Sequence, residues 1–187
     1  MSKQDNSEVN FSLKGNASIQ IGIYFLLAAY CIKSILDGFV IHENPFGMLS
    51  PQILEVLIVV LAVLLFVFSS FALFFKGRRN AKKQQVKLWN ASTKSAFYKY
   101  IASFTILFLT LYFLTKQGHI DFLVPALLII YANILFVLKN KDRKNHLIIS
   151  GICVLLAVIC FLIPSYWYSS LFILGIAHIT YGIIVKN

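Results

Sequence analysis

The sequence predicts an all-α polytopic membrane protein, with six transmembrane helices arranged in three hairpins. Hydrophobic residues make up 59% of the 187 residues and charged residues only 13%, and the mean hydropathy is +0.79. A soluble domain buries at most about three quarters of the surface that its chain exposes, which leaves no place for so much apolar surface. The apolar residues gather in six long runs, and most Lys and Arg residues lie between or beside these runs.

The same composition excludes several other classes. Intrinsic disorder requires low hydrophobicity, and a disulfide-stabilised secreted module requires far more than the three cysteines of this chain. The formal net charge of +10 does not indicate a nucleic-acid partner, because the positive charges lie mainly in two short connections. No nucleic acid is therefore expected among the partners.

Each run is long enough to cross a hydrocarbon layer as a helix, which takes about 17–25 residues. Helices are required because every backbone N–H and C=O group in lipid must be bonded within its own segment, and the runs lack the alternation of barrel strands. The six predicted spans cover residues 18–41, 53–75, 96–115, 120–138, 147–163 and 168–185.

The first hairpin comprises residues 18–41 and 53–75. A polar segment, residues 1–17, precedes it and is expected in the cytoplasm. The following apolar run exceeds the roughly 7–15 residues in the core of a cleavable signal peptide, so it is expected to remain as an anchor. The second span ends in the basic sequence FALFFKGRR, which leads into a cytoplasmic loop predicted over residues 76–95.

The second hairpin depends on one short turn, KQGH, at residues 116–119. A single long helix is the alternative, but residues 96–138 would then extend for ~65 Å, about twice the thickness of the bilayer core. Gly118 offers a break, because glycine readily adopts the conformation that ends helices. Two antiparallel helices are therefore predicted.

The third hairpin turns at Pro164, and residues 166–168 are the aromatic sequence YWY. Such residues are typical of the belt that forms at a membrane interface. Residues 129–140, IIYANILFVLKN, weakly resemble residues 176–187, IAHITYGIIVKN. Three repeated hairpins explain this similarity, as does the common tendency of spans to end in Lys or Arg, and the choice between them stays open.

The positions of Lys and Arg predict the orientation. On one side of the predicted membrane, the connections contain only Lys116. The residues of the other side are Lys3, Lys14, Lys76, Arg78, Arg79, Lys82, Lys83, Lys87, Lys94, Lys139, Lys141, Arg143, Lys144 and Lys186. The positive-inside rule therefore places both termini in the cytoplasm. The excess of Lys over Arg, with abundant Ile, Phe and Asn, is typical of an AT-rich bacterial genome, so a bacterial inner membrane is the expected location.

Lys33 and Asp37 are charged residues inside the first predicted span, where each costs about 2.5–3.5 kcal/mol. Their spacing places them on one helix face, where an ion pair offsets part of this cost, and Glu55 in the second span can join them. One interpretation is a structural pair whose side chains reach toward the nearer headgroups. The other is a polar site for an ion, a proton or a small substrate, and both stay open.

Two uncharged polar residues also lie inside predicted spans. His178 lies in the sixth span among the small residues Gly175, Ala177 and Gly182, which predict close packing of helices. A buried histidine can relay protons, but no acidic partner is identifiable for His178. An interhelical hydrogen bond is therefore expected for His178, and likewise for Asn133 in the fourth span.

No catalytic, cofactor or metal site is predicted. The three cysteines lie within spans, and no two have the spacing of a redox or zinc motif. Metal-binding side chains near the ends of spans also lack a zinc-binding spacing. These residues are His42, Glu43, His119 and Asp121. Because phosphate loops and nucleophile motifs are absent as well, an enzyme is not expected.

The basic connection predicts a contact with lipid. Its Lys side chains suit anionic headgroups, while Trp89 and Phe97 suit the headgroup layer, as in a short interfacial helix. A site for nucleic acid or a regulatory partner is the alternative. The expected partners are therefore anionic headgroups, together with a second copy of the chain or another membrane protein.

The six short spans, the hairpins and the ending GIAHITYGII, residues 175–184, resemble the small bacterial membrane proteins that include the HdeD-like acid-resistance type. The resemblance implies an inner-membrane protein of stress-related or unknown role, with no catalytic residues to transfer. The expected function is a non-enzymatic one, in interaction or in protection against membrane stress. The alternative is a small transporter, channel or substrate-binding component that uses Lys33, Asp37 and Glu55.

Overall fold

The computed structural model describes residues 13, 15–41, 51–85, 88–89, 91–137 and 143–185. These residues form α-helices and two short 3-10 segments, without any β-strand, so the predicted all-α class is confirmed. The helices are α1 (Asn16–Ile41), α2 (Pro51–Gln84), α3 (Ala91–Lys116), α4 (Leu123–Val137), α5 (Arg143–Leu162) and α6 (Trp167–Ile184). The 3-10 segments are η2 (Ile120–Phe122), before α4, and η3 (Pro164–Tyr166), before α6.

Four helices are long and apolar enough to cross a membrane. The stretches that meet this requirement are Asn16–Ile35, Glu55–Lys83, Thr93–Lys116 and Trp167–Ile184. The apolar stretches in the other two helices, Leu123–Phe136 and His146–Leu162, are shorter. Each of the six predicted spans therefore coincides with a helix, and four of these helices have the length and apolarity that spanning requires.

The second helix continues well beyond the apolar run that was predicted to end at residue 75. The predicted loop over residues 76–95 is instead largely helical, because α2 reaches Gln84 and α3 begins at Ala91. Lys, Arg, Ala and Gln are good helix formers. The last turn of α2 also contains Lys82 and Lys83, which interact favourably with the negative end of the helix dipole. Apolarity indicates where a helix can lie in lipid but does not indicate where it ends.

The turn after α3 confirms the predicted break at Gly118. This glycine has a φ of +73°, in the left-handed region. Its N–H donates to the carbonyl oxygen of Thr115 at 3.1 Å, and the N–H of His119 donates to the carbonyl oxygen of Leu114 at 2.9 Å. This pair of bonds is the Schellman motif, which satisfies the last carbonyl groups of a helix. Two helices form here, as predicted.

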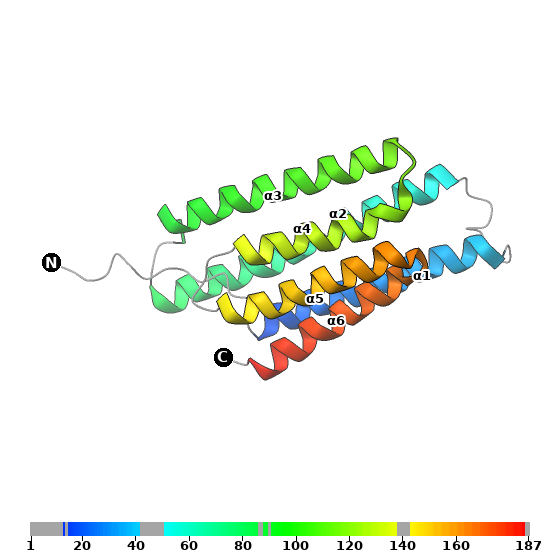
Figure 1. Cartoon of the computed structure of the whole chain (residues 1–187). Coiled ribbons are helices and arrows are strands. Elements are labelled where there is room, and N and C mark those ends of the chain that lie inside the picture. Colours follow the sequence, from blue (N-terminus) through cyan, green and yellow to red (C-terminus); the bar gives the residue numbers. More distant parts are fainter. Residues whose placement is uncertain are drawn as a thin grey trace.

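The helices lie side by side, and each runs opposite to the one before it (Figure 1). Each helix packs on the next in sequence, and α6 packs on α1, so that neighbouring helices form a closed ring. The most extensive packing joins α1 to α6 and α4 to α5, which belong to different predicted hairpins. The start of α1 and the end of α6 consequently lie at the same end of the bundle (Figure 1).

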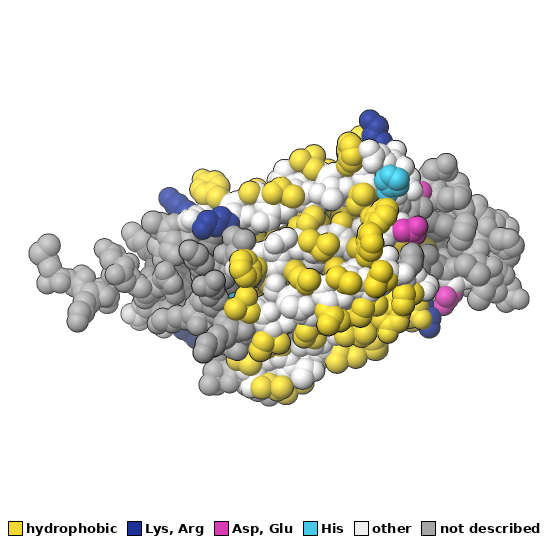
Figure 2. All heavy atoms as spheres, in the orientation of Figure 1, with side chains coloured by type: hydrophobic (Ala, Val, Ile, Leu, Met, Phe, Trp, Pro, Cys, Tyr) yellow, Lys and Arg dark blue, Asp and Glu magenta, His cyan; other side chains and the backbone are white. Residues whose placement is uncertain are grey.

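The two ends of the bundle differ in charge. We call the end at which α2, α4 and α6 finish the basic end, because exposed Lys and Arg residues of α2 and α3 lie there. The Asp and Glu residues that the structure describes, Asp37, Glu55 and Asp121, lie at the opposite end. Between the two ends, large hydrophobic side chains are exposed along the helices, as the face in Figure 2 shows.

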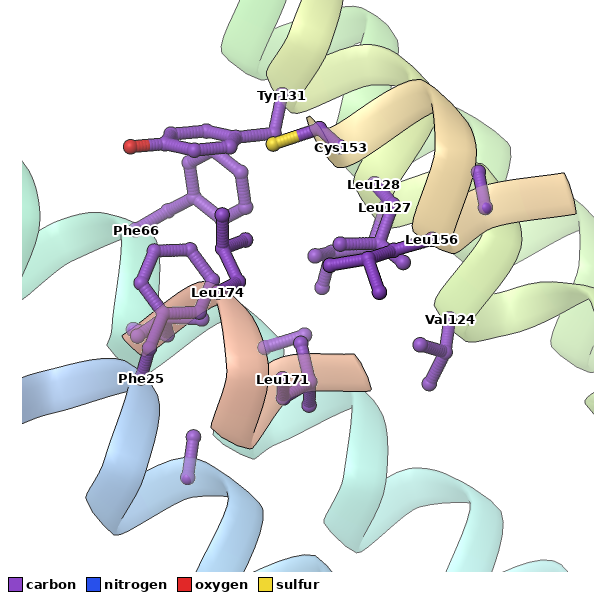
Figure 3. Close-up of a cluster of buried hydrophobic side chains, with 14 of the residues drawn as sticks. Phe25, Phe66, Val124, Leu127, Leu128, Tyr131, Cys153, Leu156, Leu171 and Leu174 are labelled. Atoms are coloured by element: carbon purple, nitrogen blue, oxygen red, sulfur yellow. The ribbon is translucent and has the colours of Figure 1, made fainter. Parts of the chain in front are cut away.

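The interior of the bundle is closely packed. Phe25 of α1, Leu171 and Leu174 of α6, and Leu128 of α4 belong to one buried cluster (Figure 3). A small cavity between α1, α2, α3, α4 and α6 has a volume of about 10 Å³ and an apolar lining that includes Leu127. A cavity of this volume holds about one water molecule, and apolar cavities stay dry. It therefore has no room for a substrate.

Candidate functional site

Glycine residues bring α1 and α6 close together. A Cβ atom on Gly22 would lie 2.6 Å from the carbonyl oxygen of Gly175, and a Cβ atom on Gly182 would lie 2.8 Å from the carbonyl oxygen of Gly15. Because both distances are shorter than van der Waals contact, only glycine fits at these positions. Small residues allow such close approach between membrane helices. The close packing predicted at Gly175 and Gly182 is confirmed.

This close approach places Ser18 of α1 against His178 of α6, and both side chains have an exposed fraction of 0%. Ser18 Oγ lies 2.8 Å from the main-chain carbonyl oxygen of His178 and 3.2 Å from its Nδ1. The serine hydroxyl has one proton, which it donates to the carbonyl oxygen. Ser18 Oγ must then accept the second bond, so the proton of the imidazole ring lies on Nδ1.

Tyr131 of α4 completes the hydrogen bonds of the imidazole ring. Its Oη atom lies 2.8 Å from Nε2 of His178. With the proton on Nδ1, the neutral ring offers a lone pair at Nε2, so the tyrosine hydroxyl donates. We call Ser18, Tyr131 and His178 the His178 cluster. It joins three helices, and it makes the interhelical hydrogen bond that was predicted for His178.

Aromatic rings enclose the His178 cluster. The ring of Phe25 stacks on the imidazole of His178, with 5.6 Å between centroids and 5° between planes. The ring of Phe66 meets Tyr131 edge to face at 5.8 Å, and Figure 3 shows both aromatic rings next to Tyr131, with Cys153 beside it. In such a dry environment a hydrogen bond is electrostatically stronger, and losing a partner is more costly.

Other polar contacts join helices elsewhere in the bundle. Ser150 Oγ of α5 donates to the carbonyl oxygen of Ala132 in α4 at 2.9 Å. Cys160 Sγ of α5 lies 2.9 Å from Ser170 Oγ of α6. His146, at the start of α5, is also buried, with 2% of its surface exposed. The two hydrogen bonds join α5 to α4 and to α6 through uncharged groups.

Sequence reasoning did not identify Ser18, Tyr131 or His146. Serine and tyrosine are ordinary residues in membrane spans, and His146 lies next to a basic connection. Neither their type nor their position therefore marked these residues as candidates. The weak internal similarity did contain a signal. Tyr131 is the third residue of the segment 129–140, and His178 is the third residue of the segment 176–187. The two residues that the similarity aligns are hydrogen-bonded to each other.

The remaining predicted polar residues lie apart from the His178 cluster. Lys33 and Asp37 are exposed near the end of α1, and Glu55 is partly exposed near the start of α2. Lys33 Nζ lies 5.4 Å from the ring centroid of Tyr168, a cation–π distance. Within the described part of the chain, no ion pair joins Lys33 to Asp37 or Glu55. Asn133, which was expected to pair between helices, has an exposed side chain on α4.

Metal-binding side chains do not converge in the part of the chain that the structure describes. No three His, Cys, Asp or Glu residues there lie close enough together to hold a metal ion. The three cysteines are free thiols. Several residues named in the sequence analysis lie outside the described ranges. They are residues 1–12, Lys14, His42, Glu43, Lys87, Lys139, Lys141 and Lys186.

Comparison with known proteins found no relative of this chain. No protein-family model matches the chain, and no curated protein or solved structure matches it. Its function has to be inferred from its own residues.

Proposed function

We propose that the chain is a multi-pass protein of a bacterial inner membrane, in which all six helices span the bilayer and both termini are cytoplasmic. At about 1.5 Å per residue, the apolar part of α5, His146–Leu162, extends for about 26 Å. With about 2.0 Å per residue in the 3-10 segment, α4 together with η2 extends for about 28 Å. Both lengths approach the thickness of the hydrocarbon core, about 30 Å. The concentration of Lys and Arg at the basic end supports a cytoplasmic location for that end.

We further propose that the protein acts through interactions within the membrane, without catalysis or transport, in a role that protects the membrane or supports a membrane partner. One observation carries this proposal. Among the side chains whose burial is described, no Lys, Arg, Asp or Glu is buried. Pathways for ions and charged substrates across a bilayer usually depend on such groups. The interior contains neutral groups bonded between helices. The stress-related part of the proposal comes from the resemblance noted in the sequence alone.

Cysteine accessibility in the full-length chain tests the proposed orientation. Gln117 lies in the turn after α3 and Lys83 near the end of α2, and both are exposed. A membrane-impermeant maleimide should label Gln117→Cys in intact cells but Lys83→Cys only after the cells are opened. The unsubstituted chain measures background labelling, because Cys153 and Cys160 are buried but Cys31 is partly exposed. The reverse pattern would overturn the orientation, and labelling of both variants in intact cells would overturn the spanning of α3.

Reconstitution into liposomes tests the proposed absence of transport. Liposomes that contain the protein should leak protons and K⁺ no faster than protein-free liposomes. The variant Lys33→Leu with Asp37→Leu should behave in the same way. Its Tm in detergent should fall by no more than about 2–4 °C, because an exposed cation–π contact contributes about 0.5–1 kcal/mol. Lys116→Leu, which removes another exposed lysine at the same end, is the matched control.

One outcome would contradict the proposed absence of transport, and a second would contradict the expected Tm of the double variant. A flux that the native chain supports and the double variant loses would establish the transporter alternative, with Lys33 and Asp37 as its polar site. A fall in Tm well beyond that of Lys116→Leu would instead mean that the two charges hold the fold together. In stressed cells, the double variant should protect the membrane as well as the native chain does.

A further inference from the structure

The basic end carries an exposed surface that the proposed function does not yet use. Residues 76–84 continue α2 beyond its apolar part for about 13 Å, at about 1.5 Å per residue. The exposed basic residues of this extension are Arg78, Arg79, Lys82 and Lys83. Ala81 lies among them but is only 4% exposed. The rest of the chain therefore covers one side of the extension, and the basic side chains lie on its open side.

Exposed aromatic side chains lie at the same end of the bundle as these basic residues. Trp89 follows α2, Phe97 belongs to α3, and their rings meet edge to face at 5.2 Å. Both remain nearly half exposed, at 47% and 44%. Lys94, which lies between them in sequence, is exposed as well. Exposed tryptophan at the edge of an apolar belt is typical of the headgroup layer of a membrane.

The positive charges at this end have no acidic counterpart in the described ranges. Asp37, Glu55 and Asp121 belong to the ends of helices and to the 3-10 segment at the opposite end of the bundle. A basic cluster directly beside a membrane-spanning helix attracts anionic lipid headgroups. The open positive charge and the exposed aromatic side chains thus indicate a ligand that is anionic and lies at the level of the headgroups.

We propose that this surface binds the headgroups of anionic phospholipids, an inference that rests on the proposed membrane-spanning arrangement. We call it the basic surface; it consists of Arg78, Arg79, Lys82, Lys83 and Lys94, with Trp89 and Phe97 at the same end of the bundle. The guanidinium groups present several donors in a plane, which suits bidentate hydrogen bonds to phosphate oxygens. The lysines add positive charge on flexible side chains, which suits headgroups that exchange with the surrounding bilayer.

Binding of phosphatidylglycerol by the full-length protein tests this inference. The native protein in nanodiscs that contain phosphatidylglycerol and phosphatidylcholine should retain phosphatidylglycerol preferentially, as measured by native mass spectrometry. Replacement of Arg78, Arg79, Lys82 and Lys83 by glutamine should weaken this preference about tenfold or more, because each basic residue near an anionic surface contributes to the attraction. Glutamine is also a good helix former, so α2 should keep its length.

Matched variants separate the site from general effects of charge. Lys33→Gln with Lys116→Gln removes two positive charges at the opposite end and should keep the preference. Arg78→Lys with Arg79→Lys keeps the charge but loses the bidentate bonds, so it should weaken the preference less than the glutamine variant does. Inorganic phosphate at millimolar concentration should not displace the lipid, because the headgroups are held at high local concentration by the bilayer.

Each failure has a distinct meaning. An unchanged preference in the glutamine variant would overturn the lipid site while the protein remained embedded in the membrane. A short RNA that displaced phosphatidylglycerol and bound more tightly would overturn it in favour of a nucleic-acid site. Recovery of the native protein in the soluble fraction without detergent would overturn the proposed membrane arrangement itself.

Discussion

Replacing Gly22 by alanine should destabilise the bundle strongly, because the new Cβ atom would lie 2.6 Å from the carbonyl oxygen of Gly175 and 2.7 Å from Cγ1 of Ile179. A carbonyl oxygen in a helix cannot move alone, so α1 and α6 must separate. Overpacking of this kind costs about 1–3 kcal/mol, which corresponds to a fall of about 2–12 °C in Tm for a chain of this length. Thermal unfolding in detergent measures the effect. Leucine at the same position should prevent the two helices from packing and reduce the yield of folded protein several-fold.

A second helical glycine provides the matched control. Gly151 belongs to α5, and a Cβ atom built on it would have no neighbour within 4 Å. Gly151→Ala should therefore leave the Tm unchanged or raise it slightly, because alanine favours a helix over glycine by about 1 kcal/mol. Equal effects of the two alanine substitutions would show that α1 and α6 are not in close contact at Gly22.

The helices themselves could be predicted from the sequence because apolarity over a membrane-length segment leaves the backbone few alternatives. The break at Gly118 was predictable for a similar reason, since it depends on one residue and its nearest neighbours. The extension of α2 to Gln84 was not predictable from hydropathy, because basic residues can be helical in water as well as in lipid. The predictable features are therefore those that depend on residues close together in the sequence.

The partners of each helix could not be predicted in the same way. The packing of α1 on α6 depends on glycine pairs such as Gly22 and Gly175, which are far apart in sequence. Charge was also a poor guide to the interior. Lys33 and Asp37 were predicted to form a structural pair or a polar site because charges are costly in lipid, yet both are exposed. The polar residues that do join helices are a serine, a tyrosine and a histidine, whose neutral side chains are inexpensive to bury once they are hydrogen-bonded.

Replacing His178 by leucine should destabilise the fold, mainly because the hydroxyl of Tyr131 loses its hydrogen-bond acceptor. The Tyr131 hydroxyl donates to Nε2 of His178 at 2.8 Å, and Tyr131 is 6% exposed, so water does not readily replace the lost acceptor. Ser18 can still donate to the main-chain carbonyl oxygen at position 178. An orphaned buried hydroxyl costs about 1–3 kcal/mol, or a fall of about 2–12 °C in Tm. Tyr131→Phe alone should also destabilise, because it leaves Nε2 without a donor.

The double variant His178→Leu with Tyr131→Phe distinguishes a coupled pair from two independent contacts. If the pair is coupled, its Tm should be no lower than that of the worse single variant, because neither partner is then left with an unmet hydrogen bond. Tyr100→Phe is the matched control for removal of a tyrosine hydroxyl. Tyr100 contacts Ser70 at 2.5 Å, but it is only partly buried, and Ser70 still donates to the carbonyl oxygen of Phe66. Its effect should therefore be below that of Tyr131→Phe. Additive losses in the double variant would mean that α4 and α6 are held together by apolar packing alone, and that the His178 cluster is not a structural unit.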